Sequence, residues 1–197
     1  YHKFVSGTQW PWMDYEFPPG IALRLPSDYG LDLNGHYFNY TDESITGEIY
    51  ANIHTVDEQD LDHVCEILML NNTDFNLPAN QITTIEKTLS FNQIKAANDL
   101  PNNIENIYLF QLFSHAHQLM TRFDVLILHE NGQEELIYTA LDYEHPPILE
   151  LDPPLTMTIG QSIISRATYY NNTDNYVNFG LLSTDEMMII FGLVYFE

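Results

Sequence analysis

The chain has 197 residues, 45% of them apolar, which predicts a folded protein of one large or two small domains. Its formal net charge of −22, from 6 Lys and Arg against 28 Asp and Glu, makes nucleic acid and anionic membrane surfaces poor partners. The single cysteine excludes an intramolecular disulfide and a cysteine-rich structural zinc site, and no run of about 18 apolar residues is present that could insert into a membrane.

The apolar residues predict strands rather than helices along most of the chain. Residues 45–55 alternate between apolar and polar side chains, which is the pattern of a half-buried strand. Residues 56–63 are acidic and alternate little, so we expect a junction between domains there. Residues 91–98 have brief helical character, and Pro101 is expected to end that helix.

Further strands are predicted over residues 106–117, 122–129, 134–139, 155–170 and 187–196. The second and third of these flank Asn131-Gly132, and Asn-Gly is the strongest short hairpin signal. Proline pairs at 18–19, 146–147 and 153–154 indicate turns or strand ends. Many short strands with such turns predict an all-β fold, an antiparallel β-sandwich of jelly-roll type.

A metal-binding hypothesis starts from His115-Ala116-His117 at the end of a predicted strand. Side chains two residues apart in a strand point to the same face, so both imidazoles can bind one ion. The thioether of Met187 added to two imidazoles favours Cu(I) while tolerating Cu(II). The alternative stays open that the histidines are an incidental pair and that Met187 fills the core. His36, at a strand end, is either a further ligand or a hydrogen-bonded histidine.

Other chemistries find little support. The sequence has no Gly-x-Ser-x-Gly elbow, no P-loop and no dinucleotide fingerprint, and Cys65 lies in an apolar run. A carboxylate pair for glycoside hydrolysis remains open, because the positions of 28 acids in the sequence say nothing of their distances in space.

From Gly20 onward the chain resembles the copper type II, ascorbate-dependent monooxygenases, the family of peptidylglycine α-hydroxylating and dopamine β-monooxygenases, and in particular their secreted bacterial relatives. The resemblance is carried by residues 19–26, 36–39, 114–117 and 185–187, followed by a tyrosine-bearing last strand. The interval of 70 residues from His117 to Met187 is similar to the ligand spacing of the family.

The resemblance implies a complete carboxyl-terminal copper-binding jelly-roll domain over residues 64–197 and a remnant of an amino-terminal copper domain over residues 1–63. It implies that His115, His117 and Met187 bind the copper that activates dioxygen beside a substrate C–H bond. His36 matches a ligand of a second, electron-transferring copper. Copper, O₂, an ascorbate-type electron donor, a small-molecule substrate and a secreted or periplasmic location follow as expectations.

The chain also departs from the family pattern. It contains no adjacent His-His pair, so we expect either that a preceding segment carries it or that the second copper site was lost. Phe113 and Phe191 stand where the peptide-amidating member has an arginine and a tyrosine that hold a substrate carboxylate, which predicts an apolar or aromatic substrate. Two rival functions remain, a non-catalytic copper module for storage or delivery and a β-sandwich interaction domain.

Overall fold

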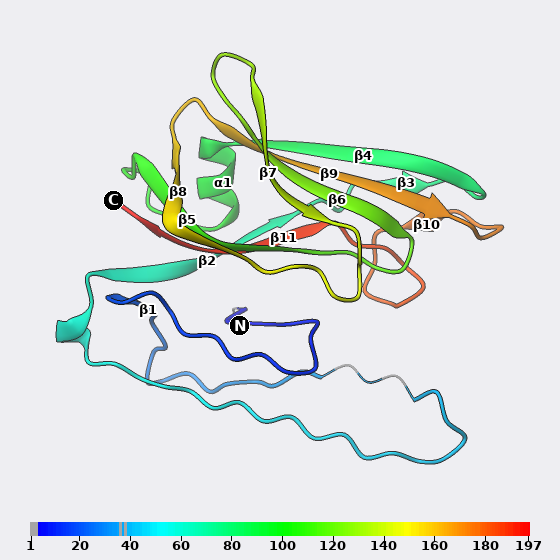
Figure 1. Ribbon diagram of the computed structural model, residues 1–197, viewed down its shortest axis with the longest axis horizontal. Coiled ribbons are helices and arrows are strands. Elements are labelled where there is room, and N and C mark those ends of the chain that lie inside the picture. The colour runs from blue at the N-terminus through cyan, green and yellow to red at the C-terminus, as the bar shows by residue number, and fades with distance from the viewer. Residues whose placement is uncertain (1–3, 36, 38) are drawn as a thin grey trace. The chain divides into compact units, whose positions relative to one another are not determined.

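The computed structural model describes residues 4–35, 37 and 39–197 and divides the chain into two compact units (Figure 1). The larger unit joins the segment that ends at Glu16 to Cys65–Glu197, and the smaller unit is Phe17–Val64. That residues 1–63 are the remnant of one copper domain and residues 64–197 a complete second one stays a prediction.

The larger unit is an antiparallel β-sandwich, which confirms the predicted all-β fold class. In its first sheet the order is β2 (His63–Asn71, entering from the smaller unit), β11 (Ile189–Phe196), β5 (Asn106–His115) and β8 (Leu149–Thr158). The second sheet has the order β4 (Gln81–Ser90), β9 (Ser162–Asn171), β6 (Met120–Leu128) and β7 (Glu134–Ala140). A short ribbon pairs β3 (Asn76–Leu77) with β10 (Val177–Asn178), and helix α1 (Phe91–Ala97) follows β4.

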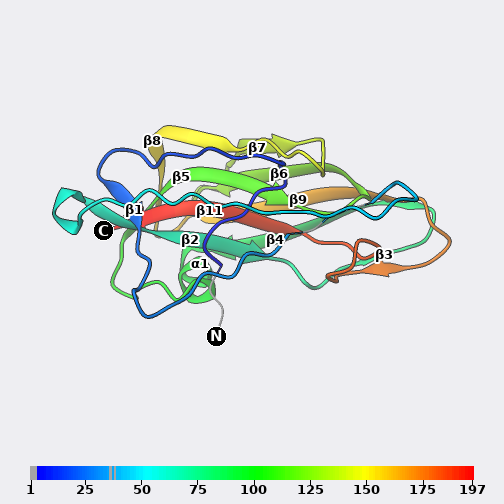
Figure 2. The ribbon, with the colours of Figure 1, turned by 90° about the horizontal axis from the view of Figure 1, so that it is seen from below.

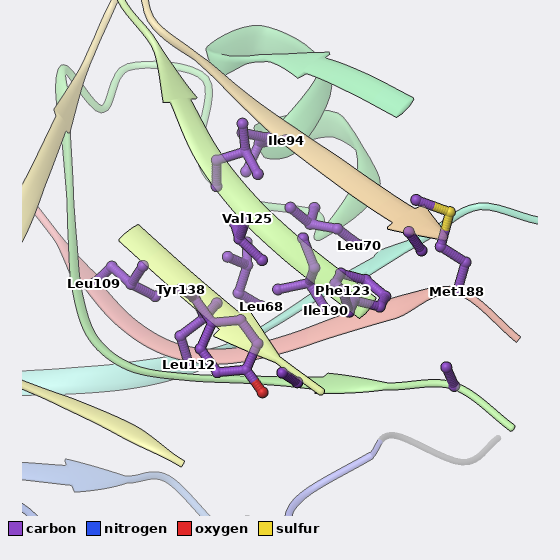
Figure 3. Packing of buried hydrophobic residues seen from close by; sticks show 14 of the residues in the cluster. Leu68, Leu70, Ile94, Leu109, Leu112, Phe123, Val125, Tyr138, Met188 and Ile190 are labelled. Carbon is purple, nitrogen blue, oxygen red and sulfur yellow. The ribbon is translucent and has the colours of Figure 1, made fainter. Parts of the chain in front are cut away.

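The core lies between the inner faces of the two sheets (Figure 3). Leu112 and Ile190 come from the first sheet and Phe123 and Val125 from the second, and all four side chains are fully buried. Every second residue of these strands is apolar and points inward, so burial of that face away from water is the main force that holds the sandwich together.

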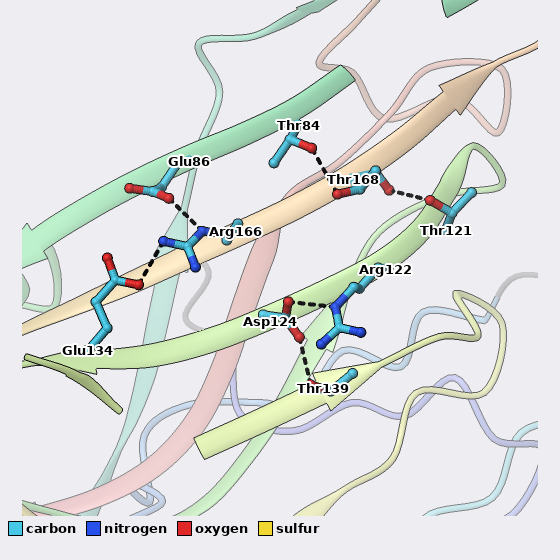
Figure 4. A network of polar contacts seen from close by, with 9 residues as sticks. All are labelled: Thr84, Glu86, Thr121, Arg122, Asp124, Glu134, Thr139, Arg166 and Thr168. Atoms are coloured by element: carbon cyan, nitrogen blue, oxygen red, sulfur yellow. Dashed lines mark hydrogen bonds and ion pairs between the residues drawn. The ribbon is translucent and has the colours of Figure 1, made fainter. Parts of the chain in front are cut away.

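The outer face of the second sheet is polar, as expected for a face exposed to water (Figure 4). Arg166 pairs with Glu86 at 2.6 Å and with Glu134 at 2.9 Å, and Arg122 pairs with Asp124 at 2.7 Å. The partly exposed pairs of Arg166 contribute little to the free energy of unfolding, whereas Asp124 is buried and also accepts from Thr139 at 2.6 Å.

The outer face of the first sheet is different, because aromatic side chains lie on it and residues 4–16 cross it (Figure 2). Phe113 stacks on Phe191 with ring centroids 5.2 Å apart, and Phe4 packs on Phe191 at 4.8 Å. The segment of residues 4–16 therefore removes part of this apolar face from water.

The smaller unit contains strand β1 (Ile21–Leu23) and the short 3-10 helix η1 (Glu58–Asp60). The N–H groups of Asp62 and His63 both donate to the carbonyl of Gly20, at 2.8 and 3.0 Å. The backbone of Gly20 has φ of 76°, a conformation that glycine adopts without strain.

The predicted strand over residues 45–55 is wrong, since none of these residues is in a strand and Ile45, Ile49 and Ile53 are exposed. An alternating pattern forms a strand only where a second strand pairs with its backbone and another layer buries its apolar face. The local sequence shows neither condition. The predicted strand over residues 155–170 is in fact two, β8 and β9, which are separated by a turn at Gly160 with φ of 94°.

Other predictions fare better. Strands β5, β6, β7 and β11 and helix α1 lie where they were expected, and Ser90 and Gln93 form a capping box at the start of the helix. Strands β2 and β4 were not predicted. Pro153 and Pro154 lie inside β8 rather than in a turn, at a break in its ladder with β5 where no proline N–H is needed. Among the described residues, no helix is long and apolar enough to cross a membrane.

Candidate metal centre

The register of two neighbouring strands brings the predicted ligands together. In the antiparallel pair of β5 and β11, Ile189 lies opposite His115, and the pairs advance one residue at a time from there. The same register continued two residues outward places Met187 opposite His117, just beyond the last paired residues. The two motifs, far apart in the sequence, therefore end at the same edge of the sheet.

The alternation of side chains decides which face these residues occupy. Ala116 and Met188 belong to the hydrophobic core, and Figure 3 shows the Met188 side chain among the core residues. His115, the last residue of β5, lies between buried Ser114 and Ala116 and so faces the opposite, outer side, whereas His117 and Met187 lie just beyond the ends of β5 and β11. Both histidines are half-buried, and Met187 is buried without being part of the core cluster. The three predicted ligands thus lie at the same edge of the sheet.

The two imidazole rings have a geometry that fits a shared metal ion. Their centroids are 5.3 Å apart and their planes make an angle of 84°. A metal–nitrogen bond of about 2.0–2.1 Å places each ring centroid roughly 3.2 Å from the ion, so two rings at a near-tetrahedral angle are about 5 Å apart. The separation of the two ring centroids is therefore that of two imidazoles bound to one ion.

Hydrogen bonds determine which nitrogen of each ring carries the proton. Nδ1 of His117 lies 2.9 Å from the carbonyl oxygen of Asp185, and Nδ1 of His115 lies 2.9 Å from the amide oxygen Oε1 of Gln9. A carbonyl oxygen only accepts, so Nδ1 is the donor in both rings and Nε2 carries the lone pair. Such an outer contact is what orients imidazoles that bind metals.

Glu186 fastens the two ligand-bearing segments to each other. Its fully buried carboxylate accepts from the backbone N–H groups of His117 at 2.9 Å, Leu119 at 2.7 Å and Met187 at 3.1 Å. Burial raises the pKa of Glu186, while the three N–H donors act in the opposite direction.

Asp185 and Glu186 precede Met187 in the sequence, and the structure gives them different roles. The backbone carbonyl of Asp185 accepts a hydrogen bond from Nδ1 of His117. The Asp185 carboxylate accepts from the N–H of Leu182 at 3.1 Å. Glu186 contacts backbone rather than imidazole. Both residues therefore position the site from outside the ligand set.

Tyr169 and Gln9 also take part, and sequence reasoning missed both. The hydroxyl of Tyr169, a fully buried residue of β9, donates to the carbonyl oxygen of Met187 at 2.8 Å. Burial and then the nearby charge of Glu186 raise the pKa of Tyr169 well above its usual value, so this hydroxyl stays protonated. Neither residue lies within a recognisable motif, so no local signal marks them.

Among the residues that the structure describes, aromatic rings lie beside His115. The ring of Phe191 lies 6.4 Å from that of His115, and the Phe113–Phe191 stack continues away from it. Neither residues 4–16 nor the four strands of the first sheet contain a lysine or an arginine. These elements therefore offer no side chain that could neutralise a ligand carboxylate.

The second predicted copper ligand, His36, lies outside the described residues. Within the part of the chain that the structure describes, no group of three or more His, Cys, Asp and Glu side chains could hold a metal. A site of two histidines and a methionine contains only two side chains of those types. The chain matches no protein-family model and no curated protein sequence.

Proposed function

We propose that the larger unit binds copper through Nε2 of His115 and His117 and the sulfur of Met187, and that it acts as a copper-dependent monooxygenase. The observation that supports it best is the contact of Nδ1 in each ring with a carbonyl or amide oxygen, which leaves Nε2 as the nitrogen with the lone pair, while the continued register of β5 and β11 puts Met187 level with His117. Zinc and other harder ions are less suited to a thioether ligand than Cu(I).

The proposal places the chain with the copper type II, ascorbate-dependent monooxygenases, on the order and spacing of residues 19–26, 114–117 and 185–187. Copper would supply one-electron redox chemistry and dioxygen activation at a substrate C–H bond, with ascorbate or a similar reductant as the electron donor. A secreted or periplasmic location belongs to the same proposal.

The residues of the chain itself would do three things in this reaction. The carbonyl of Asp185 and the amide of Gln9 hold the imidazoles in the tautomer that binds metal. Glu186 and Tyr169 hold Met187 at its place beside β5. Phe113 and Phe191 present an apolar surface next to His115, which favours an apolar or aromatic substrate without a carboxylate.

Copper titration of the purified chain tests the proposal. We expect one Cu(I) per chain in competition with a chromophoric chelator, and ascorbate-dependent O₂ consumption that requires this copper. His115→Ala should abolish both. The control is His129→Ala, because His129 lies on the hairpin side of the unit, where it contacts Glu135 and Gln161.

The outcomes separate the three functions. Wild type without stoichiometric copper, or His115→Ala with unchanged copper affinity, contradicts a metal function and leaves an interaction domain. Stoichiometric copper without O₂ consumption supports the storage or delivery function instead.

A further inference from the structure

We infer that Gln9 is a positioning residue of the candidate metal centre and that the segment of residues 4–16 completes that centre. The inference rests on the proposed copper function, because it assigns Gln9 a role in metal binding. The contacts that support it all lie within the larger unit. No sequence motif marks Gln9, and both histidines and the methionine lie more than a hundred residues further along the chain.

The amide of Gln9 makes two hydrogen bonds of opposite polarity. Its oxygen Oε1 accepts from Nδ1 of His115 at 2.9 Å, and its nitrogen Nε2 donates to the carbonyl of Tyr143 at 2.6 Å. A flipped amide would turn its NH₂ group toward the His115 donor and its oxygen toward the Tyr143 carbonyl. The two contacts therefore fix the orientation of the amide from both sides.

The rest of the segment is anchored on both sides of Gln9. Phe4 packs on Phe191 of β11, and the indole N–H of Trp10 donates to the carbonyl of Pro146 at 3.3 Å. The ring of Trp10 also packs against that of His145, with centroids 4.7 Å apart. These contacts hold the backbone around Gln9 in place, so the amide reaches His115 with little freedom left.

The two histidines depend on different kinds of partner. His117 donates to a backbone carbonyl of its own site, which no substitution removes. His115 donates to a side chain, so a substitution at Gln9 removes its acceptor and leaves His117 as an internal reference. Without that acceptor, the Nδ1–H group of His115 loses the contact that favours the tautomer with the proton on Nδ1.

Long-range ¹H–¹⁵N NMR of the metal-free protein measures the tautomer directly. The sample is kept at a pH well above the usual imidazole pKa of about 6.5, so that the rings are neutral. In wild type we expect both rings to be protonated at Nδ1. Gln9→Leu should move His115 to the Nε2-protonated form or a mixture of the two, with His117 unchanged. Gln9→Glu keeps an oxygen acceptor for His115 but loses the donor to Tyr143, so it should retain the wild-type tautomer.

Gln161→Leu is the matched control, because the amide nitrogen of Gln161 lies 3.1 Å from Nδ1 of His129. It is the same substitution beside another histidine. We expect it to change the signals of His129 and to leave those of His115 as in wild type.

Copper affinity supplies the second measurement, since loss of such an outer contact typically weakens metal binding about 10–100-fold. We expect Gln9→Leu to bind Cu(I) more weakly by that factor, with Gln161→Leu unchanged. An unchanged His115 tautomer in Gln9→Leu overturns the inference, and so does a change that affects His115 and His117 alike, since that would mean general loss of structure. A shifted His115 tautomer in a chain whose wild type binds no copper upholds the positioning role and rejects the proposed function.

Discussion

His115 lies opposite Ile189 in the antiparallel pair of β5 and β11, and this register continued by two residues puts Met187 level with His117, although 70 residues separate those two in the sequence. The intervening residues, Ala116 and Met188, both belong to the core. Packing of the core thus holds the register that brings the thioether-bearing residue and the second histidine to the same edge of the sheet. A shift of one residue would exchange Met187 with Met188 and move the outer methionine inward.

Replacement of Met187 by leucine should remove the sulfur and keep most of the volume. We expect copper to remain bound through the two histidines with lower Cu(I) affinity, because the soft ligand that stabilises Cu(I) is gone. X-ray absorption at the copper edge should show a copper–sulfur contribution in wild type and none in Met187→Leu. Met69→Leu, at an exposed position of β2 opposite Phe191, should retain it. A sulfur contribution that persists in Met187→Leu would contradict the assignment of Met187.

Replacement of Glu186 by glutamine should destabilise the larger unit. The carboxylate accepts from three backbone N–H groups, and an amide would turn donor hydrogens toward some of them. A buried donor left without an acceptor costs about 1–3 kcal/mol, so we expect a loss of that size in urea unfolding. Glu86→Gln, in an exposed pair with Arg166, should change the free energy of unfolding by less than about 1 kcal/mol. Equal effects of the two substitutions would contradict the role of Glu186.

We also expect the difference in stability between wild type and Glu186→Gln to depend on pH. Burial raises the pKa of Glu186 in the folded state above 4.5, its ordinary value, which applies in the unfolded state. At a pH between the unfolded-state and the folded-state pKa, the folded state therefore binds more protons than the unfolded state. Stability from this group is therefore present at low pH and declines as the pH rises through that window. The difference in unfolding free energy between wild type and Glu186→Gln should accordingly shrink as the pH rises above about 4.5. A difference that grows instead would show that the N–H donors outweigh burial.

Replacement of Tyr169 by phenylalanine should remove the hydrogen bond to the Met187 carbonyl. That carbonyl lies in a buried region, so the loss should lower the free energy of unfolding by about 1–3 kcal/mol. Tyr170→Phe is the matched control, because its side chain is half exposed on the next residue of the same strand. Calorimetry of the three proteins measures the effect, and a Tyr169→Phe midpoint equal to that of Tyr170→Phe would contradict it.

Part of the site could be predicted from local pattern. A period of two places His115 and His117 on one face wherever they form a strand, and β5 does end at His115. The hairpin at Asn131-Gly132 and the short helix after Ser90 also have local causes, a favoured turn and a capping box. By contrast, the alternation of residues 45–55 had no effect, because pairing and burial decide whether a strand forms.

The sequence by itself determined the residue types of the candidate site and the all-β class, since each follows from composition or from a repeat of two residues. Only the tertiary structure decided that the segments of His115 and Met187 end at the same edge of the sheet, that Gln9 accepts a hydrogen bond from His115, and that Glu186 joins the two ligand-bearing segments. These relationships depend on strand register and on contacts between distant segments. Both are set by the packing of the whole core, which cannot be predicted from any short stretch of sequence.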